Sequence, residues 1–405
     1  MKRRIAVFVF LGMLGLNVFS AWGGEISLGF TLPLTGLFSK TGKRVLDSYK
    51  LWAKKVNSQG GILIGGDRYP VKLIFYDDRS NPALSARFYE KLITEDKVDL
   101  LLGGYGSSVV FAASSVSEKY KYPFVCGGAS SNRLFERGFR YFFATLGKAT
   151  DEVRGCVEML RTFRPRPETV AIIGTDILFT SLACEGFKKY SLEAGFRVVH
   201  YELFPITLED YTTMLKHVKA KSPDVLLVGS HTQVAIHVLK ALRRIQFFPK
   251  CVIFSYGPTA PDFVRTMGKN AEYIFAASEW TADLPYRGEV FGTAADFDKD
   301  FYRAYHRHPD YVEAAAAAAA VTLQIALKSL KLHPPYTETK REVLMEKLHK
   351  MKIETFFGTI RFGEEGANVA HPPIVVQIQN GVAVSVYPEK LRRKKPIFPL
   401  PRQRF

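Results

Sequence analysis

Short apolar runs alternate with helical patterns along almost the whole chain after residue 25, and this alternation restricts the fold more than any other feature. Residues 71–77 and 98–102 are apolar and bounded by turn residues, as is typical of strands buried on both faces. Between such runs, apolar residues recur with helical spacing, as in residues 45–56. Strands that alternate with helices predict an α/β fold, with parallel sheets covered by helices on both sides.

The pattern restarts near residue 147, which predicts two units of similar size. A strand over residues 141–147 ends the first set, and a helix from about 150 to 163 opens the second. A chain of 405 residues is also long for a single core, so two compact domains are expected. Two doubly wound sheets that face each other form a cleft at the carboxyl ends of their strands.

The chain is expected to cross between the two lobes near residues 144–147, 277–280 and 356–359, which makes a stiff, multi-strand hinge. The predicted boundaries are residues 24–145 and 279–356 for lobe 1, residues 146–278 and 357–388 for lobe 2, and residues 389–405 for an extended basic tail.

The first 23 residues have the features of a cleaved signal peptide. The basic start MKRR precedes an apolar stretch that is short for a membrane span, and small residues at Ala21 and Gly23 suit cleavage after Gly23. The mature protein is therefore expected to be exported and soluble, in the periplasm or another extracytoplasmic space. An uncleaved membrane anchor is the alternative.

Charge and cysteine content exclude some classes of function. The net charge of +17 is spread along the chain until the tail, whereas a nucleic-acid binder would concentrate it with interleaved aromatic residues. A solvated basic surface is favoured, and no nucleic-acid partner is expected. No Cys/His metal-ligand spacing occurs, so no metal site is expected, and buried free thiols are favoured for all four cysteines: Cys126, Cys156, Cys184 and Cys251.

Signatures of catalysis are mostly absent. The chain contains no G-x-S-x-G, no H-E-x-x-H and no phosphate-binding G-x-x-x-x-G-K-[ST] motif. Ser107 and Ser108 are conceivable nucleophiles, but no base lies near them in the sequence. His231 follows a predicted strand, where a loop histidine and a role in the cleft are both open. We predict a protein that is not an enzyme and needs no cofactor.

Two loops rich in glycine and serine follow predicted strands of the first unit. They read GGYGSS and CGGASSNRL, and each leads toward a helix start, where free backbone N–H groups favour an anion. We predict that these loops hold a carboxylate without a fixed cation, while ordinary helix capping with no ligand is the alternative. The residues concerned are Ser107, Ser108, Ala129, Ser130 and Ser131.

Four further segments of the chain are distinctive: ISLGFTLPLTG, LWAKKVNSQGGI, FERGFRYFFATLG and the stretch from residue 71 to residue 108. They closely resemble the leucine/isoleucine/valine-binding protein family, the extracytoplasmic substrate-binding components of branched-chain amino-acid-type ABC importers. The resemblance extends from about Ile26 to the tail. It implies a type I periplasmic-binding fold, in which two lobes close on a ligand.

The resemblance also implies a set of ligand-binding positions. Ser107, Ala129 and Ser130 (or Ser131) match the family's carboxylate site, and Phe38 is placed to cover an apolar group. Phe179 and His231 match positions where the family often has aromatic residues. Amino-acid binders commonly have an acidic residue for the ligand ammonium where this chain has Tyr256, Gly257 and Pro258, with no acid before Asp262.

This departure bears on the ligand, because a buried ammonium without a partner is unfavourable. Either another acid such as Asp176 serves the ammonium, or the ligand is not an α-amino acid. The resemblance thus implies a protein that clamps an amino acid, or a related aliphatic or aromatic acid or amide, and delivers it to membrane permease subunits. A ligand sensor of the same fold that acts on a regulatory protein is the alternative.

Overall fold

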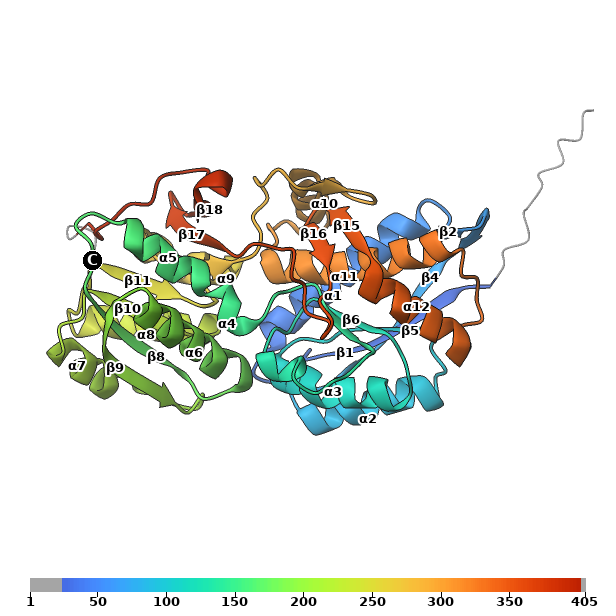
Figure 1. Ribbon diagram of the computed structural model, residues 1–405, viewed down its shortest axis with the longest axis horizontal. Coiled ribbons are helices and arrows are strands. Elements are labelled where there is room, and N and C mark those ends of the chain that lie inside the picture. The colour runs from blue at the N-terminus through green and yellow to red at the C-terminus, as the bar shows by residue number, and fades with distance from the viewer. Residues whose placement is uncertain (1–23, 402–405) are drawn as a thin grey trace, which may run out of the picture.

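Two sheets form the centres of two lobes that lie side by side in Figure 1, a computed structural model that describes residues 24–401. The predicted signal peptide lies outside the described residues. The first sheet is wholly parallel, with the strand order β4-β1-β5-β6-β7. Its strands are β1 (Ile26–Leu32), β4 (Val71–Asp77), β5 (Leu100–Leu102), β6 (Phe124–Cys126) and β7 (Phe142–Ala144).

Helices cover both faces of this sheet. In Figure 1, α2 and α3 lie below it and α11 lies above it, and α12 packs against α11. Asn81 caps α2 by accepting a hydrogen bond from the Leu84 N–H, and Pro82 is its first residue. The helices are α1 (Ser39–Asn57), α2 (Pro82–Thr94), α3 (Ser107–Lys119), α10 (Ala294–Tyr305), α11 (Tyr311–Leu330) and α12 (Glu338–Lys350).

Helix α11 packs unusually close to the first sheet. Its residues 314–320 are all alanine and fully buried, and a side chain at Gly127, after β6, would lie 2.3 Å from the Ala315 backbone. By length and composition α11 is the one helix within residues 24–401 that is apolar enough to span a membrane, yet 78% of the apolar window is buried in the protein. Small side chains thus bring the start of α11 close to the β6 loop.

The second sheet has the order β18-β17-β12-β11-β10-β8-β9. Five of its strands are parallel, and β17 and β18 add an antiparallel hairpin at one edge. The hairpin turns at Asn380 and Gly381, both with positive φ, as a two-residue turn requires. The strands are β8 (Thr169–Thr175), β9 (Arg197–Phe204), β10 (Val225–Gly229), β11 (Cys251–Phe254), β12 (Phe275–Ser278), β17 (Ile374–Gln379) and β18 (Val382–Tyr387).

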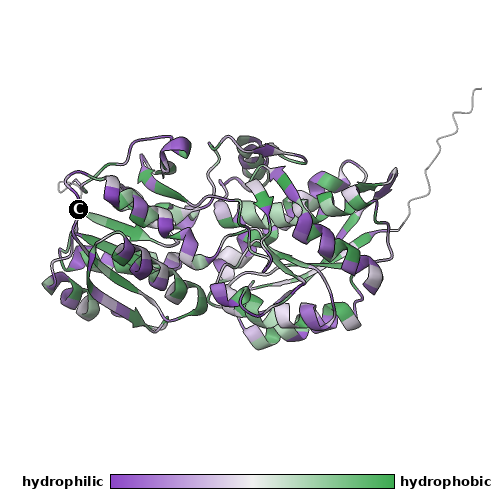
Figure 2. Ribbon diagram, in the orientation of Figure 1, coloured by the Kyte–Doolittle hydropathy of each residue, from purple (hydrophilic) through white to green (hydrophobic). Residues whose placement is uncertain are grey.

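Helices also cover both faces of the second sheet. In Figure 2 its strands are mostly hydrophobic, whereas the helices around them carry many hydrophilic residues. The helices are α4 (Ala149–Glu152), α5 (Arg154–Thr162), α6 (Leu178–Glu193), α7 (Thr212–Ala220), α8 (Thr232–Arg244) and α9 (Pro261–Met267).

Three segments cross between the lobes, at residues 145–148, 279–286 and 368–373, and together they form the hinge. The third lies beyond the predicted boundary at 356/357, which falls in the turn between β15 (Lys352–Thr355) and β16 (Gly358–Arg361). Both phenylalanines of this turn belong to the core of the first lobe, which holds the turn there. The pairing of Ala367 with Ala144 then keeps the chain beside β7.

Two further hairpins complete the first lobe. They are β2 (Ile62–Ile64) with β3 (Asp67–Tyr69), and β13 (Arg287–Gly288) with β14 (Gly292–Thr293).

The described part of the basic tail packs on the second lobe. Phe398 stacks on Phe163 with ring centroids 4.2 Å apart, and Gln377 exchanges two hydrogen bonds with the Ile397 backbone. The four cysteines are buried free thiols, as the sequence predicted.

Candidate ligand-binding site

The glycine-rich loops after β5 and β6 are packed directly against each other and against β1. A side chain at Gly104 would lie 2.7 Å from the Thr31 carbonyl oxygen, and one at Gly128 would lie 2.4 Å from the Gly104 carbonyl oxygen. Gly106, which precedes α3, has a φ of +94°, a conformation that favours glycine. These glycines bring the start of α3 next to the loop 127–131.

Ser107 joins the two loops. As the first residue of α3, it accepts hydrogen bonds at its hydroxyl oxygen from the N–H groups of Ser130 and Ser131, at 3.4 and 3.2 Å. A hydroxyl that accepts in this way keeps its own proton for an acceptor. We call Ser107 with the loop 127–131 the serine clasp.

The serine clasp borders a small cavity of about 30 Å³ between the lobes, enough for one or two water molecules. The cavity brings together six of the predicted residues, which come from loops on both sides of the cleft. They are Ser107, Ala129, Ser130, Phe179, His231 and Tyr256.

Four predicted residues lie elsewhere. Ser108 is half-buried and Ser131 is buried, and neither lines this cavity. Gly257 has a φ of +126° and packs against α8, where a side chain would lie 2.9 Å from the Ala235 methyl group. Phe38 lines a second, larger cavity instead.

A cluster of aromatic rings fills the centre of the cleft around His231. The ring centroids of Phe38 and Phe179 lie 5.0 and 5.4 Å from that of His231, and the Tyr105 hydroxyl lies 3.3 Å from His231 Nδ1. Desolvation lowers the pKa of His231 to about 4, so the ring is neutral at pH 7. His231 therefore lies in the cleft, and its role in ligand binding stays a prediction.

The large cavity, of about 560 Å³, lies at the mouth of the cleft. One wall comes from the start of α1, and the other comes from residues 206–211 and the start of α8. Tyr105 and His231 line both cavities, so these two side chains form the partition between them.

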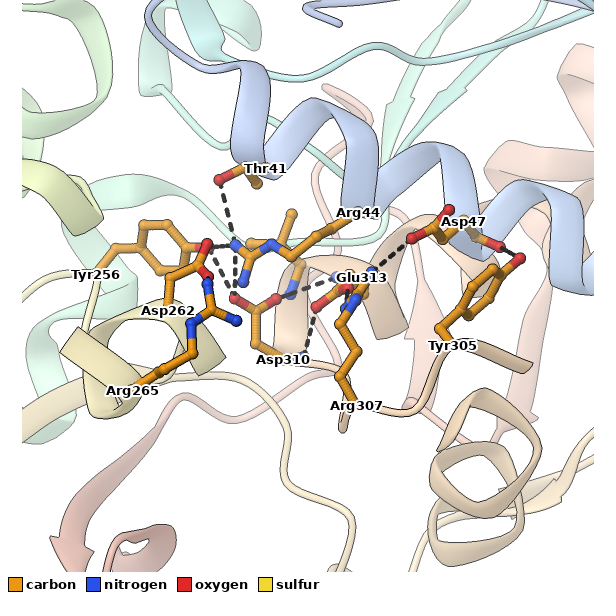
Figure 3. A network of polar contacts seen from close by, with 11 residues as sticks. Thr41, Arg44, Asp47, Tyr256, Asp262, Arg265, Tyr305, Arg307, Asp310 and Glu313 are labelled. Carbon is orange, nitrogen blue, oxygen red and sulfur yellow. Dashed lines mark hydrogen bonds and ion pairs between the residues drawn. The ribbon is translucent and has the colours of Figure 1, made fainter. Parts of the chain in front are cut away.

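Tyr256 reaches from the second lobe into a buried group of charges in the first (Figure 3). Its hydroxyl donates to Asp310 Oδ2 at 2.8 Å and accepts from Arg44 Nη2 at 3.1 Å. Arg44 Nη2 is also 3.4 Å from Asp310 Oδ2, and the Arg44 and Asp310 side chains are 7% and 0% exposed. Arg44, Tyr256 and Asp310, here called the arginine cluster, therefore link the two lobes.

The arginine cluster continues into a capping box at the start of α11. Asp310 Oδ1 accepts from the N–H groups of Val312 and Glu313, and the Glu313 carboxylate accepts from the Asp310 N–H. Burial opposes the charge on Arg44, but the neighbouring Asp310 holds its pKa well above the usual value. Burial raises the pKa of Glu313 to about 7, although Arg44 acts in the opposite direction.

A second buried cluster lies at the hinge. Glu279 Oε1 accepts from the Gly147 N–H at 3.0 Å, and Glu152 is a second buried carboxyl group that acts on Glu279 electrostatically. Burial raises the pKa of Glu152 to about 7, and burial together with the Glu152 charge raises that of Glu279 well above its usual value. We call Glu152 and Glu279 the carboxyl pair, and their raised pKa values favour a protonated form of at least one of the two groups at neutral pH.

Ser107 and Ser130 both line the small cavity. The Ser131 hydroxyl is buried and has no hydrogen-bond partner among residues 24–401, but it does not line this cavity.

Sequence reasoning missed Tyr105, the arginine cluster apart from Tyr256, and the carboxyl pair. The D-x-x-E spacing of Asp310 and Glu313 before an alanine-rich helix is a recognisable capping box. Arg44 and Glu152 carry no comparable local signal. Within residues 24–401, no group of three or more His, Cys, Asp or Glu side chains is arranged to hold a metal ion.

Two α/β lobes joined by three crossings, with a cleft at the carboxyl ends of their strands, define the class of type I solute-binding proteins. The profile of the periplasmic binding protein family matches residues 25–383, so the chain belongs to that family. Proteins similar to it include Leu/Ile/Val-binding protein homologs and substrate-binding proteins of branched-chain amino acid transporters.

Curated relatives and solved structures agree with this placement. A Leu/Ile/Val-binding protein homolog 8 of Brucella abortus is 24% identical, over 97% of this chain and 99% of the relative. The substrate-binding protein LivJ of Streptococcus pneumoniae, solved with isoleucine, has a TM-score of 0.76 at 18% identity, over 89% of this chain and 99% of its own. A Rhodopseudomonas palustris solute-binding protein, solved with benzoate, also has a TM-score of 0.76 at 18% identity, over 92% and 100%.

Proposed function

We propose that the protein binds a small carboxylate-bearing molecule between its lobes and delivers it to the membrane permease of an ABC importer. It acts outside the cytoplasm, after cleavage of a signal peptide, and without chemical change to the ligand. Membership of a family of extracytoplasmic solute-binding proteins supports the location and the absence of catalysis.

The serine clasp carries this proposal. Its Ser107 hydroxyl has a proton to donate, and it stands at the first turn of the 13-residue helix α3. Helix N-terminal N–H groups and a buried hydroxyl hold a carboxylate well, because bonds to a charged acceptor are stronger than neutral ones. The lobes close over the ligand from the side of Phe179 and His231, which already border the small cavity.

The ligand that fits this cleft best is a carboxylate without an α-ammonium group. Asp176, the alternative partner for an ammonium, is exposed and lines neither cavity. Asp310 already accepts from Tyr256, Val312 and Glu313 and faces Arg44. An ammonium bound beside Tyr256 would therefore meet a hydroxyl oxygen that already accepts from Arg44 Nη2, with the positive guanidinium next to it.

The test compares Ser107→Ala with Ser108→Ala in the mature protein. Calorimetry against benzoate, 4-methylpentanoate, leucine and isoleucine identifies which of them bind. Loss of the Ser107 hydroxyl is expected to weaken carboxylate binding by about 1–3 kcal/mol, whereas the neighbouring Ser108 does not line the small cavity and its loss leaves the affinity unchanged. Equal affinities for the two variants remove Ser107 from the site, and tight binding of the amino acids alone overturns the preference for a non-amino ligand.

A further inference from the structure

The guanidinium of Arg44 has donors that the protein does not use. Its Nη2 contacts Thr41, Tyr256 and Asp310. Its Nε and Nη1 are buried and have no hydrogen-bond partner among residues 24–401. Buried polar groups are almost always paired, and an unpaired charged donor is costly. These N–H groups therefore need a hydrogen-bond acceptor that residues 24–401 do not provide.

The same side chain lines the large cavity, opposite a second unpartnered polar atom. Thr232, at the start of α8, lines this cavity from the other lobe, and its Oγ1 is buried without a partner in the described chain. Two unused polar groups thus border one space from opposite lobes. With a volume of about 560 Å³, that space is in the range of small-molecule sites.

Apolar side chains such as Phe38, Leu208 and Val234 line much of the rest of the large cavity. Tyr105 and His231 separate it from the serine clasp through a contact of 3.3 Å between the hydroxyl and Nδ1. The small cavity alone is too small for an organic acid of several carbons. A ligand held by the serine clasp must therefore displace this partition and extend toward Arg44.

We propose that the ligand is bifunctional, with one carboxylate at Ser107, an apolar body across the partition, and a second oxygen acceptor at Nε and Nη1 of Arg44. This inference rests on the proposed function and specifies its ligand class. The second group is a carboxylate or an amide carbonyl, since both offer the lone pairs that a guanidinium fork binds. Closure of the lobes brings Thr232 onto the same group.

The charges around the large cavity favour an acceptor over a cation at this end. Lys40 and Glu209 line the cavity with exposed side chains of opposite charge. Asp262 also lines it but forms an ion pair with Arg265, and Asp310, outside the lining, faces Arg44 and Tyr256. A ligand ammonium here would meet the positive guanidinium, whereas an oxygen acceptor satisfies its unpaired N–H groups.

The test uses two series of probes of matched carbon number: α,ω-dicarboxylates and their half-amides from four to nine carbons, and the corresponding monocarboxylates. In the wild-type protein, the best bifunctional probe is expected to bind at least tenfold more tightly than its monocarboxylate. In Arg44→Lys this preference is expected to fall below about threefold, because lysine keeps the charge beside Asp310 but lacks the fork. Calorimetry measures both ratios.

Two further variants distinguish direct contact with the ligand from an effect on the stability of the protein. Arg307→Lys makes the same exchange in a neighbouring arginine that contacts Glu313 and Asp47 but does not line the large cavity, and it is expected to keep the preference. Thr232→Val removes only the hydroxyl on the other lobe and is expected to reduce the preference several-fold, which tests the site even where Arg44→Lys does not fold.

The outcomes are distinguishable. If monocarboxylates bind as tightly as the bifunctional probes at every length, and Ser107→Ala still weakens their binding, the bifunctional ligand is overturned and the proposed function stands. Absence of binding in both series overturns the proposed carboxylate site and this inference with it. Equal loss of preference in Arg44→Lys and Arg307→Lys shows that the charge network, and not contact with Arg44, sets the preference, and overturns the inference.

Discussion

The two lobes are joined by two buried clusters of ionisable groups, and the two clusters avoid unpaired buried charge in opposite ways. The arginine cluster lies at the cleft and contains a guanidinium beside a carboxylate. The carboxyl pair lies at the hinge, and neither Glu152 nor Glu279 forms an ion pair within residues 24–401. The first cluster keeps its charges by pairing them, whereas the second keeps a proton.

The difference shows which contacts can change when the lobes move. Tyr256 comes from the second lobe, whereas Arg44 and Asp310 come from the first, so opening of the cleft breaks the bonds of its hydroxyl. Glu279 and Gly147 both lie in segments that cross between the lobes. Asn368 and His371, from the third crossing segment, form hydrogen bonds with these two segments. We therefore expect the arginine cluster to respond to lobe position and the carboxyl pair to respond to pH.

The largest expected effect follows from removing the carboxylate of the arginine cluster. Asp310→Ala leaves Arg44 buried without its partner and removes the cap of α11. A buried charge stripped of its partner costs about 3–5 kcal/mol, so the free energy of unfolding in urea should fall by that amount. Asp300→Ala is the control, because its ion pair with Lys55 is partly exposed and such pairs contribute about 1 kcal/mol or less. Similar losses in both variants would mean that Arg44 is not held by Asp310.

The next largest expected effect is the pH dependence of stability that the carboxyl pair causes. The folded pKa of Glu152, about 7, is raised above its ordinary value of 4.5, so the folded state binds more protons than the unfolded state between these two values. The contribution of Glu152 to the free energy of unfolding is therefore largest below pH 4.5, and this contribution is lost as the pH rises toward 7. The difference between the two pKa values corresponds to a total loss of about 3 kcal/mol.

Glu152→Gln should remove this dependence, since an amide needs no proton to face Glu279. Unfolding in urea at pH 5, 6, 7 and 8 is expected to give a flatter profile for the variant, with a gain over wild type at pH 8. Glu136→Gln, on an exposed side chain, provides the matched control with an unchanged profile. A wild-type profile as flat as that of Glu152→Gln would show that the pair does not hold a proton.

The sequence was sufficient for features that depend on neighbouring residues. Alternating runs predicted two α/β lobes, and three of the five residues predicted in the serine-rich loops border the small cavity. The arginine cluster could not be predicted in this way, because Arg44 and Tyr256 are 212 positions apart. Gly147 and Glu279 are 132 positions apart. Such pairs arise only when the crossings bring distant segments together, and no local pattern records them.

The smallest expected effect isolates the contact between the lobes. Tyr256→Phe removes one hydroxyl from the arginine cluster but leaves Arg44 and Asp310 paired, so the free energy of unfolding should fall by about 1 kcal/mol. Tyr49→Phe removes an equally buried hydroxyl, bonded to the Gly103 carbonyl within the first lobe, and should cost a similar amount.

The two variants should differ in shape and not in stability. Without its hydroxyl, residue 256 no longer ties the second lobe to Asp310, so the ligand-free Tyr256→Phe protein is expected to open. Small-angle X-ray scattering should show a larger radius of gyration for it than for wild type, whereas Tyr49→Phe should scatter like wild type because its lost bond lies inside one lobe. Equal scattering by both variants would mean that the rings around His231, and not the arginine cluster, hold the lobes together.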